Sequence, residues 1–325
     1  MNPLAADPDP VPAHSPDLRE ELRGRQIFVT GGTGFIGSHV CRALIQAGHS
    51  IICLKRKTSS LDRCVDFRER AQWVDHDSGS WAQAVIASKP RALIHCAWAG
   101  VTAAERDDWK IQGENIALFL ELLRVAEAAG VKQFIALGSQ AEYGPIQGRV
   151  NEAHPCRPAT AYGIAKLACL ALLEGFARQR KMSHAWLRLF SIYGPGEGSQ
   201  WFIPSLVRQM KAGQAPQLTG CEQRYDYLHI HDLASAVLAV LRRPGSGGVF
   251  NLSSNASMPL KQVVQLIKES AGGRVEPVFG ALPYRPGQSM HVEGDSTRFY
   301  ETFAFTPQVT IVEGLRALAK ETATT

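Results

Sequence analysis

Three residues in the middle of the sequence, Ser139, Tyr162 and Lys166, have the types and spacing of a proton-transfer site. Tyr162 and Lys166 are four residues apart in a segment of helical pattern, so their side chains should share one face of a helix. A free tyrosine has a pKa of about 10, too high for ready proton exchange near neutrality. A neighbouring ammonium group is expected to favour the tyrosinate and lower that pKa. Ser139, at the end of a predicted strand, can donate a hydrogen bond to the same substrate oxygen, which indicates a carbonyl or alcohol substrate.

A glycine-rich segment near the N-terminus predicts a site for a nucleotide cofactor. Gly31, Gly34 and Gly37 follow the apolar run 26–29 and open an amphipathic stretch that continues through Leu44. In a strand, loop and helix of this kind, the glycines allow a tight turn and a close approach to a pyrophosphate, and the helix N-terminus offers free N–H groups. If the nucleotide carries a nicotinamide, its oxidised, positively charged ring would also favour the Tyr162 tyrosinate. The loop residues expected to bind the cofactor are Gly31, Thr33, Gly34, Phe35, Ile36 and Gly37.

The segments that must position these residues alternate between strand and helix from about residue 24 to 190. The clearest strands are apolar throughout, as in a parallel sheet covered on both faces: 27–30, 50–54, 92–97, 133–137 and 185–190. Helical patterns lie between them at 36–47, 80–88, 105–129 and 160–180. This alternation predicts an α/β fold with a doubly wound parallel sheet, of the Rossmann type.

The pattern changes after residue 190, where Gly and Pro become more frequent. Further strands are expected at 225–230 and 249–252, with helices at 232–242, 259–271 and 311–322. We predict a dinucleotide-binding domain over 22–190 plus 226–252, and a smaller, discontinuous substrate-binding lobe over 191–225 plus 253–325. Residues 1–17 contain five prolines, so 1–21 is expected to be a disordered tail.

The composition excludes several classes of function. The net charge of +5 comes from scattered Lys and Arg, which makes nucleic acid an unexpected partner. No apolar run is long enough to span a bilayer, and the N-terminal segment lacks the apolar core of a secretory signal, so we expect a cytoplasmic protein with no membrane partner. The seven cysteines include no Cys-x-x-Cys and are expected to be reduced thiols. The segment 229–232, His-Ile-His-Asp, is interpreted as a strand-to-helix junction, and no metal site is predicted.

Taken together, these motifs resemble the extended short-chain dehydrogenases/reductases, in the NAD(P)-dependent nucleotide-sugar epimerase/dehydratase group. The resemblance covers nearly all of 24–320. It rests on the glycine loop, the Tyr–Lys pair, Asn115 and the segments 94–97, 138–144, 187–195, 226–234 and 285–287. These motifs are highly specific for the family and less so for the substrate.

Departures from the family pattern discriminate between its activities. Dehydratases that resemble this chain carry an Asp-Glu pair where Gln140 and Ala141 stand. Segment 138–144, with Trp98, looks most like nucleotide-linked 4-keto-6-deoxyhexose 4-reductases. The resemblance therefore implies NADPH-dependent reduction of a C4 keto group, with Tyr162 as general acid. The alternatives are a 4-epimerase with tightly bound NAD and, from another class, a dinucleotide-binding sensor without turnover.

The end of the second strand bears on the choice of cofactor. NAD enzymes usually place an acidic residue there to bind the ribose hydroxyls, whereas this chain has Lys55 and Arg56. These cations would hold a 2′-phosphate, so NADP is favoured over NAD; the alternative is a solvated basic loop. Other residues that the resemblance places at the cofactor are Asp75, His76, Ala97, Trp98 and Asn115, together with Tyr162 and Lys166.

The expected substrate is a nucleotide-diphosphate sugar. The resemblance assigns Arg285 to its pyrophosphate, through a bidentate guanidinium. The other residues expected to bind the substrate are Ser139, Gln140, Ser191 and Trp201. A second family arginine, just before Asp226, is replaced here by Tyr225.

Helices 105–129 and 160–180 are apolar around much of their circumference. One face of each can cover the sheet and the other needs a partner. We predict a homodimer through these helices; the alternative is burial beneath the second lobe.

Overall fold

The computed structural model describes residues 26–285 and 287–321, so the tail predicted over 1–21 lies outside the described residues. Its larger sheet has seven strands in the order β10-β7-β5-β4-β1-β2-β3, all parallel. The strands are β1 (Ile27–Thr30), β2 (Ile51–Lys55), β3 (Ala71–Asp75), β4 (Ala92–His95), β5 (Gln133–Ser139), β7 (Ser183–Leu189) and β10 (Gly248–Leu252). The predicted doubly wound parallel sheet is confirmed.

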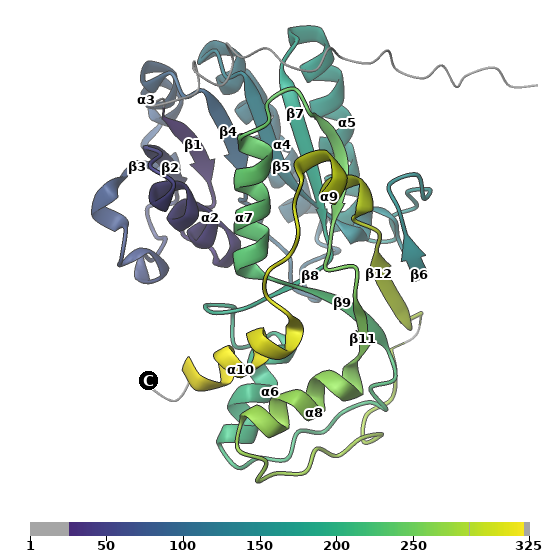
Figure 1. The fold of residues 1–325 in the computed structure, drawn as a ribbon. Coiled ribbons are helices and arrows are strands. Elements are labelled where there is room, and N and C mark those ends of the chain that lie inside the picture. The colour runs from purple at the N-terminus through teal and green to yellow at the C-terminus, as the bar shows by residue number, and fades with distance from the viewer. Residues whose placement is uncertain (1–25, 286, 322–325) are drawn as a thin grey trace, which may run out of the picture.

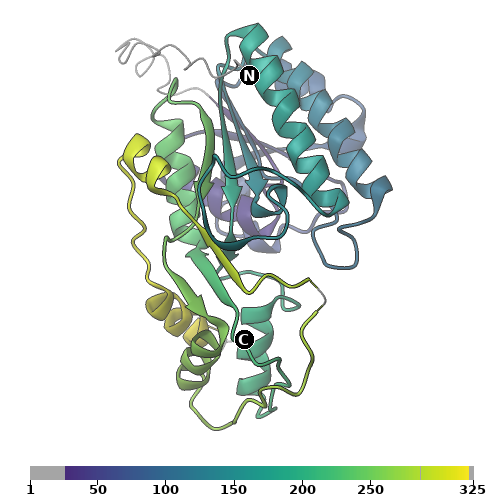
Figure 2. The same ribbon diagram turned by 90° about the vertical axis from the view of Figure 1, so that its right-hand side faces the viewer.

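Helices cover both faces of this sheet, which explains why its central strands are apolar on both sides. One face carries α2 (Phe35–Gln46), α7 (Ile230–Leu241) and α9 (Thr297–Phe303). The other carries α3 (Trp81–Ser88), α4 (Trp109–Ala128) and α5 (Ala161–Arg180). Figure 2 shows the two layers on opposite sides of the strands. Every residue of β1, β4 and β5 is buried.

A second, smaller lobe lies below the C-terminal ends of the large sheet in Figure 1. Its sheet runs β11-β9-β12-β6, and β8 pairs with β9. These strands are β6 (Gln147–Val150), β8 (Ser191–Tyr193), β9 (Arg224–His229), β11 (Ser257–Pro259) and β12 (His291–Gly294). Three helices with a shared apolar core complete the lobe: α6 (Phe202–Lys211), α8 (Leu260–Ser270) and α10 (Ile311–Glu321).

Short 3₁₀ turns occur at η1 (Asp62–Cys64), η2 (Arg68–Arg70), η3 (His76–Ser78) and η4 (Gln140–Glu142). Of these, η4 directly follows β5 and shapes the site described below. Among the described residues, no helix has both the length and the apolar character needed to cross a bilayer.

Some strands belong to a different sheet than the predicted domain boundaries imply. Strand β6 pairs in parallel with β12, although residues 147–150 were expected in the dinucleotide-binding domain. Strand β9 likewise belongs to the second sheet, whereas α7 and β10 return to the first. These pairings join segments distant in the chain, so local pattern could not reveal them. The division into domains stays a prediction.

Helix α4 starts at Trp109, not at the predicted residue 105, because Asp108 caps it. The Asp108 carboxylate accepts hydrogen bonds from the backbone N–H groups of Lys110 and Ile111. An N-cap residue of this kind satisfies N–H groups that have no partner within the helix. Residues 105–108 therefore belong to a loop, and this loop contacts the site.

Candidate active site

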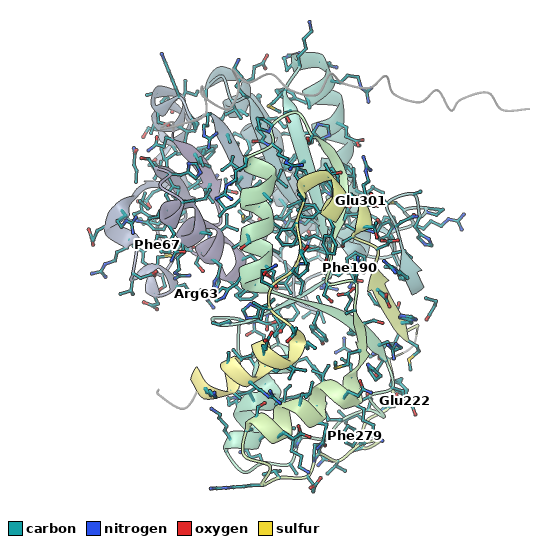
Figure 3. All side chains as sticks on the ribbon, in the orientation of Figure 1. Arg63, Phe67, Phe190, Glu222, Phe279 and Glu301 are labelled. Atoms are coloured by element: carbon teal, nitrogen blue, oxygen red, sulfur yellow. The ribbon has the colours of Figure 1, made fainter. Side chains whose placement is uncertain are left out.

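The C-terminal ends of β1, β4, β5 and β7 border a cavity of about 1260 Å³ that also touches the second lobe. Phe190, labelled in Figure 3 where the two lobes meet, is part of its wall. Most predicted site residues line this cavity: Gly31, Gly34, Phe35, Ile36, Gly37, Trp98, Ser139, Gln140, Tyr162, Lys166, Ser191, Trp201 and Arg285. The others lie outside its lining: Thr33, Lys55, Arg56, Asp75, His76, Ala97 and Asn115.

The structure brings Ser139, Tyr162 and Lys166 together at one wall of the cavity. Helix α5 starts at a Thr160 cap, whose Oγ1 accepts a hydrogen bond from the Gly163 N–H at 3.1 Å. Tyr162 and Lys166 then fall on the buried face of the first turns. Ser139 lies beside Tyr162, and the interaction between their hydroxyl groups lowers the pKa of the tyrosine. Ser139 and Tyr162 therefore lie side by side at the cavity, with Lys166 one helical turn further along α5.

The Lys166 ammonium is buried against the sheet. Its Nζ donates a hydrogen bond to the Leu137 carbonyl oxygen at 2.7 Å and lies 3.6 Å from the centre of the Trp98 ring. Burial lowers the pKa of Lys166 to about 8, although the charge of Glu142 acts in the opposite direction. Lys166 therefore loses its charge as the pH rises through that value.

The pKa of Tyr162 does not shift in the predicted direction. Burial disfavours the phenolate and raises this pKa, and the interaction with Ser139 and the charge of Arg106 only partly offset it. Lys166 Nζ is 5.9 Å from the centre of the Tyr162 ring. A nearby cation alone would lower the pKa of Tyr162, but the cost of desolvating the phenolate is larger.

The glycine loop packs tightly against neighbouring backbone. Gly31 has φ +73°, and a Cβ there would lie 2.6 Å from the Ala97 backbone nitrogen. A Cβ on Gly37 would lie 2.0 Å from the Gly31 carbonyl oxygen, so the first turn of α2 packs directly on the loop. Gly34 caps α2 without any side-chain hydrogen bond. The N–H groups of the first turn, beside the cavity, are thus available to a phosphate at the positive end of the helix dipole.

The basic residues after β2 differ in their surroundings. Lys55 lies opposite Asp75 in the β2–β3 register and forms an ion pair with it. Arg56 is exposed, and His76 stacks on Trp81 with ring centres 5.7 Å apart. Asp75 therefore partly neutralises Lys55, whereas Arg56 is open to solvent.

Asn115 and Ala97 lie behind the cavity wall and support the loop after β4 that carries Trp98. Asn115 accepts a hydrogen bond from the Ala99 N–H and donates one to the Ala99 carbonyl, each at 3.0 Å. Its side chain therefore fixes the loop backbone behind the cavity wall. The Ala97 N–H donates to Thr30 Oγ1 at 3.3 Å, which ties this loop to β1.

Comparison with known proteins identifies the family. The model of the NAD dependent epimerase/dehydratase family matches residues 27–253. The chain belongs to this family. It is 28% identical over 321 residues to GDP-6-deoxy-D-mannose reductase of Pseudomonas aeruginosa, with 91% of this chain and 97% of the reductase covered. It is 26% identical to a Rhizobium meliloti UDP-glucose 4-epimerase, with 85% and 88% covered.

A solved structure of a family member has the same fold. The Thermotoga maritima UDP-glucose 4-epimerase, crystallised with UDP-glucose, superposes with a TM-score of 0.84 at 26% identity. The alignment covers 92% of this chain and 99% of the epimerase. As an extended short-chain dehydrogenase/reductase, the chain is an enzyme with an NAD(P) cofactor.

One residue that supports the site, Glu142, was not predicted from the sequence. Glu142 is completely buried and holds Ser139 in place through the Ser139 N–H at 2.7 Å. The same carboxylate accepts hydrogen bonds from Trp186 Nε1 at 2.9 Å and Arg188 Nε at 2.7 Å. Ser139 and Glu142 form a capping box around η4. The Ser-x-x-Glu spacing was the available signal.

Proposed function

We propose that this enzyme reduces the C4 keto group of a nucleotide-diphosphate 4-keto-6-deoxy sugar, with NADPH as the hydride donor. The observation that carries the proposal is the convergence of Ser139, Tyr162 and Lys166 on the cavity that the glycine loop also lines. When bound, the nicotinamide would supply the hydride for the carbonyl carbon.

The side chains of the chain itself account for the proton. In this proposal Ser139 Oγ donates a hydrogen bond to the keto oxygen, and Tyr162 delivers the proton that turns this oxygen into a hydroxyl. Lys166, next to Tyr162, would hold the ribose of the cofactor and stabilise the tyrosinate left behind. Arg285 lines the same cavity and would meet the substrate pyrophosphate.

Two observations favour reduction over other family reactions. The η4 turn presents Gln140 and Ala141 to the cavity, so it lacks the carboxylate pair of the dehydratases that the chain resembles. Arg56, exposed beyond β2, suits the 2′-phosphate of NADPH better than the free ribose of NAD. The similarity to a GDP-6-deoxy-D-mannose reductase supports the same reading, although UDP-glucose 4-epimerases are nearly as similar.

The direct test is incubation with NADPH and a panel of 4-keto-6-deoxy sugar nucleotides, carrying dTDP, GDP, CDP or UDP, with the products analysed by NMR. We expect NADPH consumption and a C4 hydroxyl with one of them. Tyr162→Phe should lower turnover by a factor of about 10² to 10⁴ with little effect on cofactor affinity. Near-normal turnover in that variant would refute the role of Tyr162.

The second candidate is a nucleotide-sugar 4-epimerase, since the same three side chains can remove and return a proton and the similarity to epimerases is close. Purified protein that retains NAD through gel filtration and interconverts UDP-sugars without added NADPH would favour it. A chain that binds a dinucleotide but turns over neither class of substrate would instead be a sensor.

We also propose that the enzyme forms a homodimer through α4 and α5. Leu120 on α4 and Ile164 on α5 are 40% and 39% exposed, and Trp109 at the start of α4 is 64% exposed. Exposed large apolar side chains on two helices that pack against each other favour a protein interface there.

A further inference from the structure

The loop between β4 and α4 reaches the catalytic helix at the position of Tyr162. The Tyr162 N–H donates a hydrogen bond to the Arg106 carbonyl oxygen at 2.8 Å, and the Ala161 N–H donates to Asp107 Oδ1 at 3.0 Å. The first N–H groups of a helix have no partner within it. Residues 106 and 107 satisfy two of them, which fixes this loop against the start of α5.

This attachment also places a positive charge over the catalytic phenol ring. The Arg106 guanidinium carbon lies 5.3 Å from the centre of the Tyr162 ring, and Nε donates to the Val101 carbonyl oxygen at 2.9 Å. Arg106 is half-buried and lines the cavity. Within 26–285 and 287–321, no carboxylate forms an ion pair with it, so its charge is not neutralised locally.

We propose that Arg106 is a positioning residue that, together with Lys166, holds the negative charge forming on Tyr162 during proton transfer. The inference deepens the proposed function, since it assigns a further residue to the same site. Lys166 alone stabilises this negative charge poorly because its positively charged ammonium is directed at Leu137 and Trp98.

The other groups around Tyr162 show why Arg106 is needed to stabilise its phenolate. Ser139, at the end of β5, favours the phenolate, and the Glu142 carboxylate of η4 opposes it. From α5 itself, burial lowers the pKa of Lys166 to about 8, so this cation is lost in mildly alkaline solution. A guanidinium keeps its proton at any such pH. Arg106 therefore supplies a charge that persists where that of Lys166 fades.

The test is the ionisation of Tyr162 in the whole protein, followed by NMR with ¹³C-labelled tyrosine. The chain has seven tyrosines, and the signal that disappears in Tyr162→Phe identifies the right one. In Arg106→Gln, we expect the phenolate fraction on the rising part of the titration to fall about three- to tenfold, because a cation at this distance is lost. Arg106→Lys should recover most of this loss.

Arg124→Gln is the matched control, since Arg124 is an exposed arginine near the far end of α4, and it should titrate as the wild type does. Unchanged ionisation in Arg106→Gln overturns the proposal. If Arg106→Gln does not fold, two experiments replace it. The same titration is done on Arg106→Met, which keeps part of the aliphatic stem, and the pH dependence of turnover is measured in Arg106→Lys. The NMR titration needs no substrate, so failure of the proposed reduction leaves this result unaffected, and the reverse also holds.

Discussion

Replacing Glu142 by glutamine keeps the shape of the side chain but removes the negative charge that pairs with Arg188 in a buried ion pair. Glu142 is completely buried and Arg188 is 4% exposed, with 2.7 Å between Oε2 and Nε. The glutamine can still accept hydrogen bonds from Ser139 N and Trp186 Nε1, yet the guanidinium loses its counter-ion. Removing one partner of a buried pair costs about 3 to 5 kcal/mol of unfolding free energy.

The assay is urea unfolding followed by circular dichroism. With a slope of about 3 kcal/mol per molar urea, the expected loss lowers the midpoint by about 1 to 2 M. Glu127→Gln is the matched control, because Glu127 also pairs with an arginine, Arg180, but both side chains are nearly half exposed. An exposed pair contributes at most about 1 kcal/mol. Equal losses in the two variants would show that burial does not set the strength of these pairs.

Other predictions concern cofactor choice, acid stability and assembly. Arg56→Ala should shift the preference of the enzyme from NADPH toward NADH, measured as the ratio of kcat/KM for the two; an unchanged ratio means that Arg56 faces water. Burial lowers the pKa of His39 and His229 to about 4, so they stay neutral in the folded state while the unfolded chain binds protons below about pH 6.5. The stability that depends on these two histidines should be full above that pH and fall toward pH 4. Burial raises the pKa of Glu197 to about 8, so this single group acts in the opposite direction and favours the folded state as the pH falls. A melting temperature that does not fall between about pH 7 and about pH 5 would contradict this balance. Leu120→Glu should produce monomers in analytical ultracentrifugation if α4 forms the dimer interface, and an unchanged sedimentation coefficient would argue against that interface.

Much of the large sheet could be predicted because its signals are local. The apolar strands, the glycine loop and the Tyr–Lys spacing are each encoded within short windows of sequence. The alternation of the strands with helices predicts that the strands run parallel. In the glycine loop, a Cβ at Gly31 or Gly37 would collide with the backbone. Ser139 could be placed at a strand end for the same reason.

Contacts between distant segments could not be predicted from such windows. Strand β6 joins β12, more than a hundred residues further along the chain. Lys55 forms an ion pair with Asp75 only because β2 and β3 pair in a register that sets these residues side by side. Glu142 has a visible capping spacing, but its partner Arg188 comes from another strand.

The sequence by itself determined the family, the sheet that binds the dinucleotide and the residue types available for proton transfer, because all three are written in contiguous motifs. Tertiary structure alone decided how those residues are charged. Burial raises the pKa of Tyr162 and lowers that of Lys166, and a loop more than fifty residues earlier in the chain brings Arg106 to the phenol ring. The electrostatic state of a side chain depends on everything packed around it, and packing joins parts of the chain that no local pattern connects.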